Sequence, residues 1–132
     1  MEARLSLLAI AGAVVLPLSL GAASTPSVLA QTTGGLWEFS GKSGTPPTRR
    51  CILRPPLLAQ VEHGSAKCTR TVIRNDSASA VIEYSCAGAG SGHSEITVLT
   101  PRSVRIDTQG IAGQAPFGYV VQARRVGDCP GH

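Results

Sequence analysis

The sequence predicts a mainly β (α+β) domain: a curved antiparallel sheet of about six or seven short strands with one short helix, stabilised by disulfides. Three observations lead to this fold class. Short runs rich in Val, Ile, Thr and Tyr recur along the chain, separated by turn signals roughly every ten residues. One stretch alone has helical spacing. Four cysteines follow an apolar N-terminal segment, which is typical of an exported, disulfide-bonded chain.

The clearest element is a β-hairpin over residues 68–86, with a cysteine at each outer end. Its arms, 68–74 and 80–86, are joined by residues 75–79, whose types form turns through side-chain to backbone hydrogen bonds. Folding about Ser77 sets three pairs opposite one another: Arg70 with Tyr84, Val72 with Ile82, and Cys68 with Cys86. Alternation then places one set on a single face: Cys68, Val72, Ile82, Tyr84 and Cys86.

Five further strands are predicted on either side of this hairpin. They lie within residues 34–42, 48–53, 94–100, 104–107 and 117–126. In the first of them, Trp37 and Phe39 share one face, which we expect to turn inward. The Gly-rich stretches 87–92 and 109–115 show no strong pattern, so we predict flexible connections there.

The single helix is predicted from Pro55 to His63. Proline suits the first turn of a helix, and Leu57, Leu58 and Val61 lie at helical spacing. Gly64 falls where a left-handed cap is expected, and His63 is placed to interact with the helix dipole.

The N-terminus resembles a secretory signal peptide. Arg4 precedes an apolar run of 16 residues, Leu5–Leu20, which is too short for a comfortable membrane span. Small-residue cleavage sites end at Ala23 and at Ala30, and we favour the second. This gives a signal peptide over residues 1–30 and a single domain over 31–132, located in the periplasm or secreted; an uncleaved N-terminal anchor is the alternative.

The four cysteines are expected to form two disulfides. The hairpin register pairs Cys68 with Cys86, which leaves Cys51 for Cys129. Each bond would stabilise the fold by about 3 kcal/mol. The spacings of 16, 17 and 42 intervening residues contain no close cysteine pair of the kind that structural zinc sites use, so no metal or other cofactor is predicted.

The charge of the chain limits its partners. With 12 Lys and Arg against 8 Asp and Glu, the formal charge is +4, which is too small and too dispersed for a nucleic-acid-binding protein. The paired arginines 102/105 and 124/125 are read as charged edges that discourage sheet aggregation. We expect peripheral membrane contact at most.

One set of residues suggests catalysis. His93 lies two residues from Glu95 on the same face of a predicted strand, so it could act with Glu95 or with Ser91 in a small hydrolase-like site. No third partner completes a triad. The preceding Gly88–Gly92 run lacks the last glycine of a dinucleotide-binding motif and leads into a strand. We therefore predict no catalytic residues.

The chain resembles a family of small exported bacterial proteins. The shared features are Gly35-Leu36-Trp37-Glu38 soon after the signal peptide, a cysteine before a Pro-initiated helix (Cys51 to His63), two mid-chain cysteines, and the ending Ala123-Arg124-Arg125-Val126-Gly127-Asp128-Cys129. Over nearly all of the mature chain these features are similar to domain-of-unknown-function family 3617. The resemblance implies a periplasmic or secreted location and a β-rich fold. It carries no established activity and no catalytic residues.

These observations together predict an exported, non-enzymatic binding or accessory protein of the bacterial envelope. Its partner would be a small ligand or another envelope protein. We expect the binding surface on the concave face of the sheet or on the connections 87–93 and 109–116. The alternatives are the hydrolase-like enzyme around His93 and a structural or inhibitory partner of an envelope protein.

Overall fold

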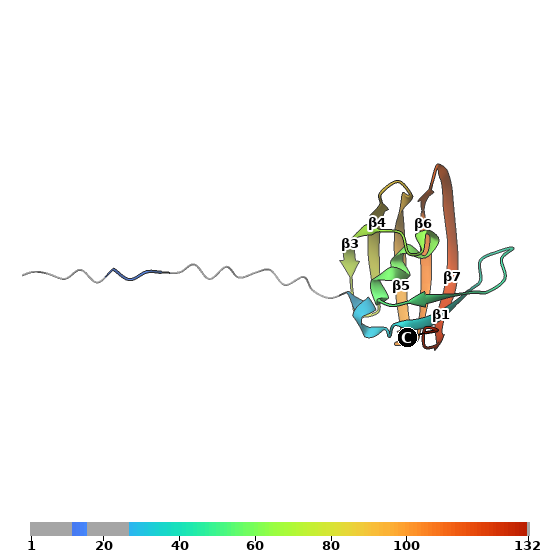
Figure 1. The fold of residues 1–132 in the computed structure, drawn as a ribbon, viewed down its shortest axis with the longest axis horizontal. Coiled ribbons are helices and arrows are strands. Elements are labelled where there is room, and N and C mark those ends of the chain that lie inside the picture. The colour runs from blue at the N-terminus through green and yellow to red at the C-terminus, as the bar shows by residue number, and fades with distance from the viewer. Residues whose placement is uncertain (1–11, 16–26, 132) are drawn as a thin grey trace, which may run out of the picture.

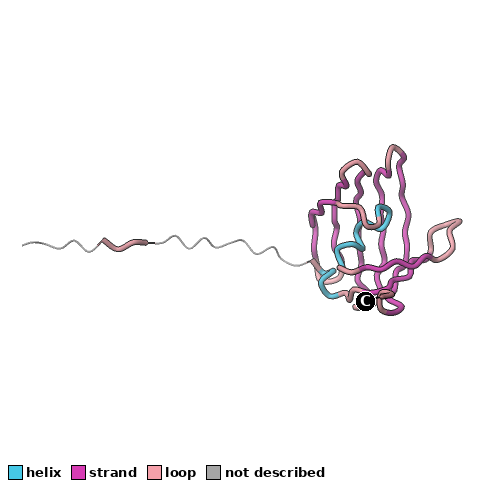
Figure 2. The backbone as a smooth tube through the Cα atoms, in the orientation of Figure 1, coloured by secondary structure: helices cyan, strands magenta, loops and turns pink. Residues whose placement is uncertain are grey.

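The structure is a computed structural model that describes residues 12–15 and 27–131. The fold is one antiparallel sheet and two short 3₁₀ helices, and Figures 1 and 2 show the helical turns lying against the sheet. The strands are β1 (Gly35–Ser40), β2 (Thr48–Ile52), β3 (Cys68–Asn75), β4 (Ser79–Cys86), β5 (Gly90–Thr100), β6 (Ser103–Ala112) and β7 (Ala115–Gly127), and the helices are η1 (Val28–Gln31) and η2 (Pro55–His63). The predicted fold class is confirmed.

The seven strands lie in the order β2-β1-β7-β6-β5-β4-β3. From β3 to β7 the sheet is a simple meander, in which each strand pairs with the next. The N-terminal strand β1 then pairs with the last part of β7, with a register shift between Leu36 and Trp37. Figure 1 shows β1 running across the lower ends of the long strands, so the sheet curls around its concave face.

The central hairpin has the predicted register. Arg70 lies opposite Tyr84, Val72 opposite Ile82 and Cys68 opposite Cys86. The turn is held as expected, because the Asp76 carboxylate accepts hydrogen bonds from the backbone N–H groups of Ala78 and Ser79 at 3.0 and 2.8 Å. These bonds lower the pKa of Asp76.

The 3₁₀ helix η2 covers the concave face. It spans the nine residues predicted for a helix, and it buries Leu58, Ala59 and Val61 against β4, β5 and β6. Gln60 interrupts the helix at φ −114°, ψ 39°. Gly64 ends the helix as predicted, but at φ 55°, ψ −122°, which is not the left-handed helical conformation expected for the cap. The buried Gln60 amide donates to the carbonyls of Gly64 and Ala66, both at 2.9 Å, and so fixes the chain that follows the helix.

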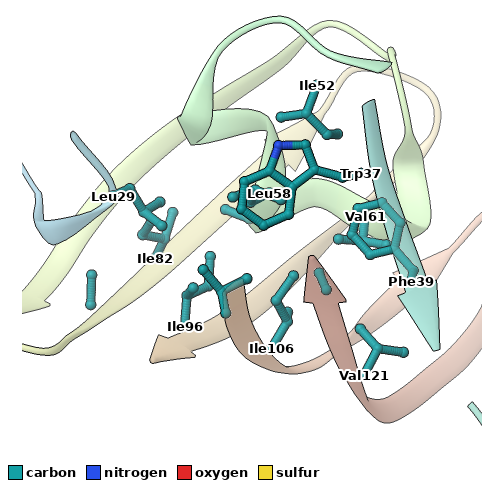
Figure 3. Close-up of a cluster of buried hydrophobic side chains, with 14 of the residues drawn as sticks. Leu29, Trp37, Phe39, Ile52, Leu58, Val61, Ile82, Ile96, Ile106 and Val121 are labelled. Atoms are coloured by element: carbon teal, nitrogen blue, oxygen red, sulfur yellow. The ribbon is translucent and has the colours of Figure 1, made fainter. Parts of the chain in front are cut away.

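The core fills the space between η2 and the sheet. Figure 3 shows Trp37 and Leu58 at its centre, with a row of sheet side chains along one side: Ile82, Ile96, Ile106 and Val121. Trp37 is fully buried, as its inward face predicted, and its indole N–H donates to the Thr33 carbonyl at 3.1 Å. Two buried hydroxyls complete this interface: Ser94 donates to the Ala59 carbonyl at 2.6 Å and lies 2.8 Å from Thr108.

The N-terminal turn η1 belongs to the same core. Val28 and Leu29 are buried, and η1 contacts β4, β5 and η2. Most of the predicted signal peptide, residues 1–30, falls outside the described residues. No helix in the described ranges is long and apolar enough to cross a membrane.

The prediction of flexible connections over residues 87–92 and 109–115 is wrong, because most of these residues belong to strands. Of residues 87–93, only 87–89 form a turn, and of residues 109–116, only Gly113 and Gln114 lie outside strands. Glycine occurs at two of these positions because a larger side chain would not fit. A Cβ on Gly92 would meet the Tyr84 ring at 2.4 Å, and one on Gly110 would meet the Ser91 carbonyl oxygen at 2.1 Å. Nor is the concave face open to ligands, because η2 fills it.

Leu58→Ala tests whether η2 docking holds the core together. Leu58 has no exposed surface, whereas Leu53, just before η2, is 61% exposed. We expect Leu58→Ala to lower the free energy of unfolding by about 2–5 kcal/mol, because it leaves a cavity. Leu53→Ala, the matched control, should change it by no more than about 0.5 kcal/mol. Urea titration measures both, and equal effects would contradict this packing.

Candidate functional site

All four cysteines serve the scaffold. Cys68 bonds to Cys86 and Cys51 to Cys129, with Cα–Cα distances of 4.0 and 5.3 Å, so both predicted pairings are confirmed. No free cysteine remains. A small β protein with two disulfides is consistent with an oxidising extracellular or periplasmic space.

The predicted hydrolase-like residues share a face but not a contact network. His93 faces Glu83 on the neighbouring strand, with 3.6 Å between Nδ1 and Oε1, and not Glu95. Glu95 instead pairs with Arg74 at 3.4 Å. No hydrogen bond joins Ser91 to His93 among the described residues, so the structure does not show an activated nucleophile.

The surroundings of His93 also lack an obvious oxyanion site. His93 and Ser91 line an open depression of about 550 Å³ on the outer face, together with Gln109. Strand β5 is paired on both sides there, with β4 and β6. Its backbone N–H groups are therefore engaged in the sheet and are not available as a pair to stabilise an oxyanion.

His63 lies in the last turn of η2, as predicted, and it also contacts the sheet. Its ring lies edge-on to both Tyr84 and Phe117, at centroid distances of 5.3 and 5.8 Å. Nε2 lies 3.0 Å from the Ala89 carbonyl, which only accepts hydrogen bonds, so Nε2 carries a proton. In the neutral ring, Nδ1 then accepts from the Tyr84 hydroxyl at 3.0 Å. His63 thus ties the end of η2 to the sheet.

Glu62, next to His63, is engaged by two groups. Its carboxylate accepts a hydrogen bond from the Tyr119 hydroxyl at 2.7 Å and forms an ion pair with Lys42 at 3.6 Å. The Lys42 ammonium also lies 4.3 Å from the centroid of the Tyr119 ring. The negative charge of Glu62 is therefore satisfied within the protein.

Two depressions flank the outer side of η2, and we call them together the η2 groove. They have volumes of about 540 and 550 Å³ and share Leu57 and Ser65 in their linings. One lies toward β3 and the other toward β2. Such volumes fall in the range of small-molecule sites.

The η2 groove is cationic. Its lining contains four basic side chains, Arg50, Arg54, Lys67 and Arg70, and a single carboxylate, Glu62. Arg70 donates to the Gln60 side-chain oxygen at 2.5 Å, and Arg50 donates to the Val61 carbonyl. Both acceptors are uncharged, and within the described residues Arg54 and Lys67 have no side-chain partner. Positive charge in the groove is therefore not neutralised by the protein.

The arginine pairs noted in the sequence lie elsewhere. Arg124 pairs with Glu38 at 3.3 Å, and Arg49 pairs with the same carboxylate at 3.0 Å. The hydrogen bonds from Arg49 and Arg124 lower the pKa of Glu38. Arg125 is held by Asp128 at 2.5 Å and by the Gly34 carbonyl. These arginines are held in ion pairs within the protein. The bases of the η2 groove come from separate parts of the chain, and no pattern in the sequence predicted that they lie together.

No protein-family model, curated protein or solved structure matches this chain. The resemblance to family 3617 stays a prediction. The described residues also contain no group of three or more His, Cys, Asp or Glu side chains placed to hold a metal ion.

The two tyrosines give a test of the contacts around η2. Burial raises the pKa of both Tyr84 and Tyr119, and the Glu62 carboxylate that accepts the Tyr119 proton raises it further there. We expect neither to ionise near the ordinary value of about 10 while the protein is folded. Stability should fall as pH rises above this value, because the unfolded chain releases these protons first. Ultraviolet titration of tyrosinate checks this.

The same titration in urea is the control, where both tyrosines should ionise normally. A folded protein whose tyrosines both ionise near the ordinary pKa would contradict the buried contacts with His63 and Glu62.

Proposed function

We propose that this protein is an exported binding protein of the bacterial envelope, not an enzyme, and that it binds an anionic amphiphile in the η2 groove. One observation carries the proposal. Four basic side chains surround two adjoining depressions, and the only carboxylate in the lining is already engaged by Tyr119 and Lys42. Uncompensated cations around a concave surface favour an anionic ligand.

The apolar part of the ligand is inferred from the leucines in and beside the groove. Leu57, partly buried, lines both depressions, and Leu53 is 61% exposed next to Arg54. Phe39, Ile52 and Val61 add further apolar side chains to the depression toward β2. A molecule with an apolar chain and an anionic head would contact both kinds of surface.

The disulfides support the export part of the proposal. Two disulfides are consistent with an oxidising compartment, and the apolar N-terminal run is of the length expected for a signal peptide.

Arg54→Glu is the direct test of the anion site. We expect dodecyl phosphate, below its micelle concentration, to bind the disulfide-bonded protein, and Arg54→Glu to weaken binding about tenfold through the loss of a charge-assisted contact. Arg105→Glu is the matched control, because Arg105 is exposed on the face of β6 opposite to its buried side chains Val104 and Ile106. Calorimetric titration measures affinity, and amide chemical shifts locate the site.

Two probes separate the possible sources of binding. Dodecyl maltoside, which carries no charge, should bind at least tenfold more weakly than dodecyl phosphate, and so should inorganic phosphate, which has no chain. Equal loss of affinity in Arg54→Glu and Arg105→Glu would show nonspecific attraction and contradict the site. Ester hydrolysis that disappears in a folded His93→Ala variant would favour the enzyme alternative instead.

A further inference from the structure

The turn η1 is part of the folded domain, although all of its residues except Gln31 precede the predicted mature N-terminus at Gln31. Leu29 has no exposed surface and Val28 is 4% exposed. Figure 3 shows Leu29 beside Ile82 at the edge of the core cluster. The backbone N–H of Val28 also donates to the Asn75 side-chain oxygen at 2.9 Å, which joins η1 to the end of β3.

A second pair of bonds fixes the exit from η1. The backbone N–H and the hydroxyl of Thr32 both donate to the Leu29 carbonyl, at 2.9 and 2.7 Å. Thr32 is itself buried. Residues 28–32 thus form a closed turn that covers the core beside η2.

We propose that processing removes residues 1–23 and leaves η1 on the mature domain. A signal-peptidase-type endoprotease would add water across the Ala23–Ser24 peptide bond, leaving a carboxylate on Ala23 and an amino group on Ser24. The proposal takes export as given but does not depend on the ligand of the η2 groove.

Two arguments favour Ala23 over Ala30. Cleavage after Ala30 would remove Val28 and Leu29, and the core would lose two buried side chains that no other described segment replaces. The position in the sequence agrees, because cleavage sites follow closely on the apolar segment. Gly21-Ala22-Ala23 comes directly after the run that ends at Leu20, whereas Ala30 lies ten residues beyond it.

The test is the mass and N-terminal sequence of the product when the full chain is exported by a Gram-negative host. We expect a protein that begins at Ser24, seven residues longer than one that begins at Gln31. Ala23→Phe should cause the precursor to accumulate, because a large residue before the cleaved bond blocks small-residue sites. Ala30→Phe, the matched control at an exposed residue, should leave processing unchanged.

A product that begins at Gln31 would overturn the proposal, as would accumulation of precursor in Ala30→Phe but not in Ala23→Phe. An uncleaved wild-type chain would also overturn it and would favour the N-terminal anchor. Each of these results is independent of whether dodecyl phosphate binds.

Discussion

The packing of η2 into the concave face of the sheet is the interaction on which the rest of the structure depends. A curved seven-stranded sheet of this size exposes an apolar inner surface, and η2 covers it with Leu58 and Val61. Apolar contact alone would leave the helix backbone carbonyls unsatisfied. Ser94 satisfies the Ala59 carbonyl, and His63 joins the helix end to Tyr84 and to the turn after β4. The disulfides then secure the two margins of the sheet, one across β3 and β4 and one between β2 and the C-terminal end.

This docking also creates the candidate site. Because η2 fills the inner face, the two depressions of the η2 groove lie on the outer side of the helix, one toward β2 and one toward β3. The kink at Gln60 and its bonds to Gly64 and Ala66 bring the following link back along the helix. Lys67 and Arg70 thereby come to the same groove as Arg54, which precedes the helix. The packing of η2 therefore both orders the core and brings the basic side chains of the groove together.

Local patterns were sufficient for much of the fold. The register of the central hairpin followed from alternation and from its two cysteines, and Pro55 and Gly64 bounded the helix because their backbone preferences are strong. The parts of β5 and β6 around Gly92 and Gly110 were missed, since glycine is needed there to make room for the Tyr84 ring and for a neighbouring backbone, which are tertiary contacts. The groove was missed for the same reason. Its bases are far apart in the sequence, whereas the adjacent arginines that the sequence displays are neutralised by Glu38 and Asp128.

Amide hydrogen exchange of the disulfide-bonded protein tests the central claim most directly. If η2 docking holds the sheet's inner face together, the amides of η2 that are hydrogen-bonded should exchange only through the same opening as those of β4, β5 and β6. Leu58→Ala should then speed exchange in all of these elements together. Fast, independent exchange of η2 beside a fully protected sheet would contradict the claim, because it would show that the sheet is stable without its helix.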